Sequence, residues 1–125
     1  MEIDKFKIRY KTKIIEINNV KKLSNIGKIT GLMFKSKKTA NLLFEFKKDV
    51  RISIHSFFVF FPFLAIWLDK DNAFLEYKLV TSFTPSIIPK NKFRKLLEVP
   101  LNNKNMEIIS LFVGRKHLNI KSSIN

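Results

Sequence analysis

The chain has 125 residues, of which 24 are basic and 10 acidic, giving a formal net charge of +14, and it has no cysteine. A hydrophobic fraction of 46% in a chain of this length supplies one domain-sized core, which argues against disorder. The lack of cysteine excludes a disulfide scaffold and a thiolate zinc site. The two histidines, His55 and His117, have no neighbours at metal-ligand spacing. No catalytic triad, carboxylate pair or phosphate-binding glycine loop is visible, so we expect a non-enzymatic protein without a metal or other cofactor.

The positive charge has two interpretations. Of the 24 cations 20 are lysine and 4 are arginine, and asparagine (11) and isoleucine (16) are also abundant. Lysine, asparagine and isoleucine share A/T-rich codons, so an A/T-rich genome would produce this profile without selection for a ligand. Arginine, the residue favoured for bidentate recognition of phosphate and bases, is scarce. The functional alternative is a polyanionic partner such as nucleic acid.

The N-terminal segment predicts a half-buried strand. It begins with Glu2 and Asp4 rather than with the apolar core of a signal peptide, and we expect a cytoplasmic protein. Cations then alternate with less polar residues, a period of two that would place five cations on one face at intervals of about 6.8 Å. These cations are Lys5, Lys7, Arg9, Lys11 and Lys13. Such a row could track a nucleic-acid backbone, but it is also typical of an edge strand whose lysines prevent aggregation.

The remaining pattern predicts a mostly β single domain over residues 1–125, built as a compact barrel-like sheet with one or two short helices. Ser24 is a suitable N-cap for a helix that carries its apolar stripe over residues 26–33. Residues 93–99 fit either a strand or a helical turn, and residues 115–125 are expected to fray. The other expected strands are Leu42–Phe46, Val50–Ile54, Ala73–Val80 in a hairpin with the strand before it, and Met106–Val113 ending at Gly114.

Residues 52–68 form an apolar block rich in phenylalanine. Its length is below the 20 or so residues of a spanning helix, and Pro62 interrupts it, so we expect two strands that meet at this proline rather than a membrane span. Both faces of the stretch before Pro62 are apolar and must be covered. The cover is either another part of the chain or a partner, and an uncovered aromatic face would favour a homodimer.

A family resemblance rests on five segments in this order and spacing: Gly31–Phe34, Leu42–Phe46, Ile54–Asp69, Phe83–Pro85 and Leu96–Pro100. The chain resembles, over roughly residues 20–114, the family called domain of unknown function 192. The resemblance implies a compact, mostly β fold with a short helix leading into Gly31. It implies no reaction, because the family has no settled biochemical role.

The chain also departs from the family pattern at its most polar positions. Many members have Met-Lys-Asn-Thr where this chain has Ser56, Phe57, Phe58 and Val59, and an aspartate after the proline where it has Leu64. We expect that whatever these positions do in other members is absent or different here.

Two functional hypotheses follow. The leading one is a binding module of unknown ligand, with a site where residues 31–34 and 55–62 meet. Its candidate residues are His55, Ser56, Gly31 and Met33. The alternative is a nucleic-acid-binding protein that uses the row from Lys5 to Lys13.

Overall fold

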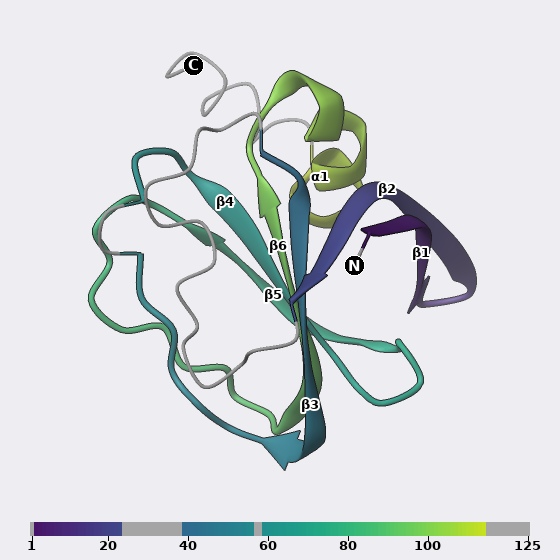
Figure 1. Ribbon diagram of the computed structural model, residues 1–125, viewed down its shortest axis with the longest axis horizontal. Helices are drawn as coiled ribbons and strands as arrows, with labels where there is room; N and C mark the ends of the chain where they lie inside the picture. Colours follow the sequence, from purple (N-terminus) through teal and green to yellow (C-terminus); the bar gives the residue numbers. More distant parts are fainter. Residues whose placement is uncertain (1, 24–38, 57–58, 115–125) are drawn as a thin grey trace.

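The computed structural model describes residues 2–23, 39–56 and 59–114 (Figure 1). Within these ranges six strands form one sheet, and a short helix follows the last strand. The helix expected over residues 26–33, the candidates Gly31 and Met33, and the tail 115–125 lie outside the described residues. The elements are β1 (Glu2–Tyr10), β2 (Lys13–Leu23), β3 (Asn41–Val50), β4 (Phe63–Leu68), β5 (Phe74–Val80), β6 (Phe93–Pro100), the 3-10 turn η1 (Asn103–Asn105) and α1 (Met106–Val113).

The sheet has the strand order β1-β2-β3-β6-β4-β5 and curls strongly (Figure 1). Neighbouring strands are antiparallel except β2 and β3, which are parallel. The curl brings the end of β1 to the start of β5, where the N–H of Arg9 donates to the carbonyl oxygen of Asn72 over 2.9 Å. The expected mostly β class with a barrel-like sheet and a short helix is therefore confirmed.

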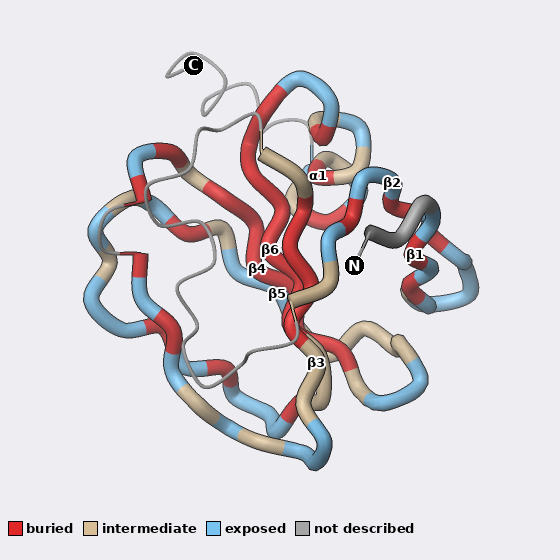
Figure 2. Tube along the Cα trace, in the orientation of Figure 1, coloured by how far each residue is buried: buried red, intermediate tan, exposed pale blue. Residues whose placement is uncertain are grey.

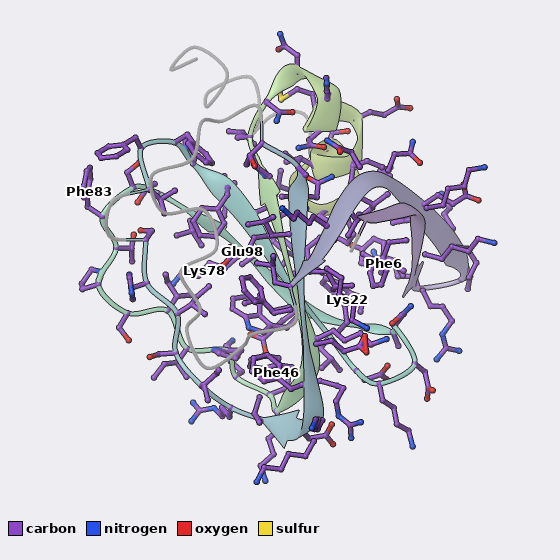
Figure 3. All side chains as sticks on the ribbon, viewed as in Figure 1. Phe6, Lys22, Phe46, Lys78, Phe83 and Glu98 are labelled. Atoms are coloured by element: carbon purple, nitrogen blue, oxygen red, sulfur yellow. The ribbon has the colours of Figure 1, made fainter. Side chains whose placement is uncertain are left out.

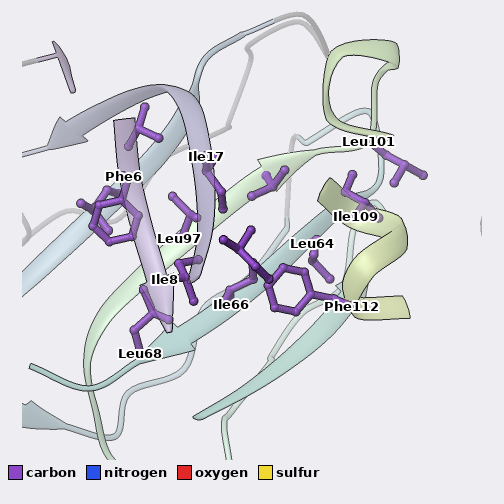
Figure 4. Packing of buried hydrophobic residues seen from close by; sticks show 14 residues of the cluster. Phe6, Ile8, Ile17, Leu64, Ile66, Leu68, Leu97, Leu101, Ile109 and Phe112 are labelled. Atoms are coloured by element: carbon purple, nitrogen blue, oxygen red, sulfur yellow. The ribbon is translucent and has the colours of Figure 1, made fainter. Parts of the chain in front are cut away.

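The two faces of the sheet bury separate apolar clusters. On one face, Ile8 of β1 and Ile66 of β4 pack against Phe112 of α1 (Figure 4). On the other, Phe63 and Trp67 of β4 pack with side chains from the segments before β4 and after β5. All six residues of β4 are buried, and the central strands carry most of the buried positions (Figure 2). A strand covered on both faces explains why β4 is continuously apolar.

The expected strand over Met106–Val113 is wrong, since these residues form α1. A short apolar run does not distinguish the two structures, but Ile109 and Phe112 are three residues apart and both buried, as on one side of a helix. Upstream, the side chain of Asn102 accepts a hydrogen bond from the N–H of Asn105 and starts η1. Gly114, with a φ of 84°, ends the helix.

Two other boundaries differ from the expectation. The break expected between the strands Leu42–Phe46 and Val50–Ile54 is wrong, because β3 runs through residues 47–49 to Val50, and its pairing with β6 shifts register there. The strand over 50–54 is also wrong beyond an isolated bridge at Ile54. Of the two strands expected around Pro62, the one after the proline exists as β4, whereas residues 59–61 lie in a loop.

The remaining β predictions are confirmed. The segment over 93–99, which fits a strand or a helical turn by sequence, is the strand β6. The hairpin of β4 and β5 forms around a turn in which the carboxylate of Asp69 accepts from the N–H groups of Asp71 and Ala73. None of the helices in the described part of the chain is long and apolar enough to span a membrane.

Candidate functional site

The hairpin of β1 and β2 presents a basic outer face. Lys5, Lys7 and Arg9 are exposed, whereas Phe6 and Ile8 between them are buried in the core, which confirms the alternation expected for this segment. Pairing in β1 and β2 places Asn18, Glu16 and Ile14 opposite the three cations on the same outer face. From residue 5 to residue 9, the side chains of β1 thus alternate between solvent-facing cations and buried apolar residues.

The sequence predicted a row of five cations on one strand, and the structure places three of them, Lys5, Lys7 and Arg9, on β1. The strand ends at Tyr10, and Lys11 lies in the turn with a φ of 57°. Lys13 belongs to β2, where it pairs with Tyr10 rather than extending the line of Lys5, Lys7 and Arg9. The alternation of cations continues through the turn with the same period, so the turn is not visible in the sequence alone.

Lys11 and Lys13 still belong to the hairpin of β1 and β2. The Nζ of Lys11 lies 5.3 Å from the centre of the Tyr10 ring, a cation–π contact, and Lys13 is exposed. Over the hairpin, residues 2–23, there are seven cations and three anions, Glu2, Asp4 and Glu16. The carboxylate of Glu16 is 4.0 Å from the Nζ of Lys5, and both side chains are about half exposed or more. A pair that exposed contributes little to stability, and the hairpin keeps a net positive charge.

Acidic side chains elsewhere are used within the fold. Glu45 pairs with Lys22 and Lys95, and Asp49 pairs with Arg94. Glu76 accepts hydrogen bonds from the backbone N–H groups of residues 90 and 91. These carboxylates pair with cations or accept hydrogen bonds from backbone donors, and one of the cations, Lys22, belongs to β2.

Ser56, a candidate ligand-binding residue from the sequence, has a structural role: its hydrogen bonds hold the turn after β5. It is fully buried, and its hydroxyl donates to the carbonyl oxygen of Thr81 over 2.7 Å and accepts from the N–H of Thr84. Its backbone carbonyl accepts from the N–H of Phe83. The hydroxyl is therefore occupied in holding the turn after β5. Its neighbour His55 is exposed, so the two side chains do not face one ligand together.

The turn held by Ser56 displays an exposed aromatic pair. Phe60 and Phe83 are 61% and 52% exposed, and their ring centres are 5.5 Å apart in an edge-to-face arrangement. Phe83 has a φ of 61°, an unfavourable conformation for a bulky side chain. Val59 and Phe61, in contrast, are covered by the chain itself. Among the described residues of this region, the alternative of an uncovered aromatic face thus applies to Phe60 and Phe83, and the homodimer stays a prediction.

A polar groove of about 480 Å³ lies between β2 and the start of α1. At its base Asn105 donates to the side-chain oxygen of Asn41 over 3.0 Å and to the carbonyl oxygen of Pro100 over 2.8 Å. Asn41 donates in turn to the carbonyl oxygen of Asn18. These amides satisfy one another, and they join β2, β3 and η1 rather than offer open hydrogen-bonding groups to a ligand.

Glu98 on β6 is a polar residue that the sequence reasoning passed over. It is 4% exposed, and burial raises its pKa from the ordinary value of 4.5 to about 8. The signal was present in Leu96–Pro100, where a single charge interrupts an apolar run, but only the neighbouring strands show that both faces of that run are covered.

Comparison with known proteins supports the fold. No family model matches the chain, and no curated protein matches its sequence. Two solved structures are similar, both with a TM-score of 0.59. A protein of unknown function from Novosphingobium aromaticivorans is 10% identical, and the match covers 81% of this chain and 74% of that one. A "putative transcription regulator" from Sinorhizobium meliloti is 14% identical, with 80% and 84% covered. At these identities the similarity establishes a shared fold.

Proposed function

We propose that this protein is a non-enzymatic binding module whose β1–β2 hairpin binds the phosphate backbone of a nucleic acid. The carrying observation is the outer face of β1, where each solvent-facing side chain from residue 5 to residue 9 is a cation on a strand anchored from below by Phe6 and Ile8. A rigid strand holds these charges at a fixed spacing of about 6.8 Å. Fixed cations release condensed counterions when they meet phosphates, and this release drives binding.

Protection of a sheet edge explains part of this pattern. β1 is an edge strand, and lysines on such a strand discourage pairing with another chain. Edge protection does not require Lys11, which lies in the turn, or Lys21, which lies where β2 is paired with both β1 and β3. The charge of the whole hairpin, rather than of β1 alone, therefore favours an anionic partner.

The experiment measures fluorescence anisotropy of labelled oligonucleotides, single- and double-stranded, against the protein at increasing salt. If the five cations from Lys5 to Lys13 contact a single-stranded nucleic acid, the plot of log K against log salt concentration should have a slope of about −3.5. The triple variant Lys5→Gln, Lys7→Gln and Arg9→Gln should reduce the slope by about two and weaken binding at every salt concentration.

A matched control removes the same charge elsewhere. Lys47, Lys48 and Lys92 are exposed and lie outside the hairpin, so their replacement by glutamine lowers the net charge equally. This variant should bind nearly as well as the wild type. Equal losses in both triple variants would overturn the proposal, as would a hairpin variant that aggregates while its soluble fraction binds normally, which is the outcome expected for edge protection.

We also propose membership of the family called domain of unknown function 192. The segments that carry the resemblance fall largely on the sheet, with Leu42–Phe46 on β3 and Leu96–Pro100 on β6. The antiparallel pairing of β3 with β6 brings these two segments side by side, although they are more than fifty residues apart. A structure of an undisputed member with the same strand order and the same pairing would support the assignment, and a different order would contradict it.

A further inference from the structure

A small pocket, the turn pocket, lies where the turn of the β1–β2 hairpin meets α1. Its volume is about 250 Å³, below the range of about 300–1,000 Å³ that is usual for ligand pockets. A pocket of this size suits one ring system rather than an extended ligand. The residues that line it are Tyr10, Lys11, Thr12, Lys13, Ile15 and Leu111.

The apolar part of the turn pocket is preformed. Tyr10 is half-buried, and its ring centre lies 4.8 Å from that of Phe74 and 4.8 Å from that of Phe112, so the core fixes its position. Ile15 is buried in the same cluster. Leu111, in contrast, is 49% exposed and presents apolar surface to solvent from α1. A ring that enters the pocket therefore gains apolar contacts without a rearrangement of the core.

The rim of the turn pocket is basic. Lys11 and Lys13 are exposed, and none of the described residues that line the pocket is acidic. The Nζ of Lys11 lies 5.3 Å from the centre of the Tyr10 ring, at the pocket itself. Within the described residues, the side chains of Thr12 and Lys13 form no hydrogen bond or ion pair. Apolar walls beside two cations match a flat, uncharged ring that is joined to an anion, which is the chemistry of a nucleotide.

The turn pocket is continuous with the basic outer face of β1. Phe6 lies on the inner side of the hairpin, and nitrogen-tipped side chains extend from its outer side (Figure 3). Arg9 is the last cation of this face, and the next residue, Tyr10, already lines the pocket. Ile14, which pairs with Arg9, is 58% exposed. An exposed apolar side chain at Ile14 or Leu111 adds little to contacts with a phosphate backbone but suits a base.

We propose that the hairpin binds single-stranded nucleic acid and that one base of the strand enters the turn pocket. This inference rests on the proposed function above and adds the class of nucleic acid. Phosphates follow the outer face of β1, and the inserted base contacts Tyr10 and Leu111. Lys11 and Lys13 bind the phosphates beside that base. A base in a duplex is stacked and paired, and must be flipped out before it can enter the pocket, whereas a single strand presents its bases without that cost.

The test compares a labelled oligothymidylate with an abasic oligonucleotide of the same length by fluorescence anisotropy. The two strands have the same phosphates and differ in their bases. The wild type should bind the oligothymidylate about tenfold more tightly, which corresponds to one contacted base. Leu111→Gln removes the exposed apolar wall and should bind the oligothymidylate about fivefold more weakly, with unchanged affinity for the abasic strand. Ile88→Gln, at a position that is 52% exposed and outside the hairpin, is the matched control and should bind like the wild type.

A duplex and a salt series separate this inference from the proposed function. Leu111→Gln should change neither the affinity for a duplex nor the slope of log K against log salt concentration, because an apolar contact releases no counterions. If the wild type binds both single strands equally while the triple variant of Lys5, Lys7 and Arg9 weakens both, the base pocket is refuted and the function of the hairpin stands. Equal losses of Leu111→Gln on the single strand and the duplex would also overturn the inference. If the triple variant binds like the wild type, the proposed function fails and this inference fails with it.

Discussion

The pH dependence of folding should be controlled to a large extent by Glu98. Burial raises the pKa of this carboxyl from 4.5 to about 8 in the folded protein, so between these values the folded state holds a proton that the unfolded state has released. Stability changes with pH according to the protons bound in the unfolded minus the folded state. This difference is negative here, and the free energy of unfolding should fall as pH rises through this window.

The magnitude follows from the same two values. One pH unit corresponds to about 1.4 kcal/mol for one proton, so the full window is worth about 5 kcal/mol and the part up to pH 7 about 3 kcal/mol. A domain of this kind has a total stability of about 5–15 kcal/mol, so the effect should be large enough to measure easily. Below pH 4.5 the contribution disappears because the carboxyl is protonated in both states.

The assay compares urea denaturation of the wild type and Glu98→Gln from pH 5 to pH 9. The stability of the variant relative to the wild type should rise by about 1.4 kcal/mol per pH unit and level off above pH 8. The test is the slope of this stability difference against pH. The buried amide of the Glu98→Gln side chain has its own desolvation cost, which changes the stability by the same amount at every pH. Glu107→Gln, at an exposed position of α1, is the control and should run parallel to the wild type. A parallel curve for Glu98→Gln would refute the reasoning.

Two further predictions concern buried hydrogen bonds, both measured by urea denaturation. Ser56→Ala leaves the carbonyl of Thr81 and the N–H of Thr84 without their buried partner and should cost about 1–3 kcal/mol, while Ser53→Ala, at an exposed position, should cost almost nothing. Asn105→Ala removes the bonds to Asn41 and Pro100 and should cost about 3 kcal/mol, with the exposed Asn103→Ala as its control. If a variant and its control lose the same free energy of unfolding, the hydrogen bonds of Ser56 or of Asn105 contribute little to stability.

Much of the sheet could be predicted from local pattern. The alternation of cations with Phe6 and Ile8 identified β1 and its buried face, and the turn at residues 69–73 identified the hairpin of β4 and β5. These signals succeed because side chains in a strand alternate between faces and because turn residues stabilise their own backbone conformation. The run Met106–Val113 was misassigned because eight apolar residues fit a strand as well as a buried helix until the packing against β4 is known.

The candidate sites, too, could be predicted only in part from the sequence. The basic segment was visible in the sequence, but its turn was not, and only the pairing of β1 with β2 separated Lys13 from the row of Lys5, Lys7 and Arg9. Ser56 was named as a ligand-binding candidate because of its place in an unusual block, whereas its hydroxyl bonds to backbone groups some 25 residues away. Contacts between residues so far apart in the sequence cannot be predicted from a local sequence pattern.

The positive charge of +14 and the mostly β class of the chain are properties of the sequence alone, because composition sets the charge and the period of two sets the strands. Where the charges lie was decided by the tertiary structure, which pairs Glu45 and Asp49 with cations and places Lys5, Lys7 and Arg9 together on the outer face of β1. The same holds for Glu98. Its environment depends on which strands lie beside β6, and strand order is a non-local property that no window of sequence contains.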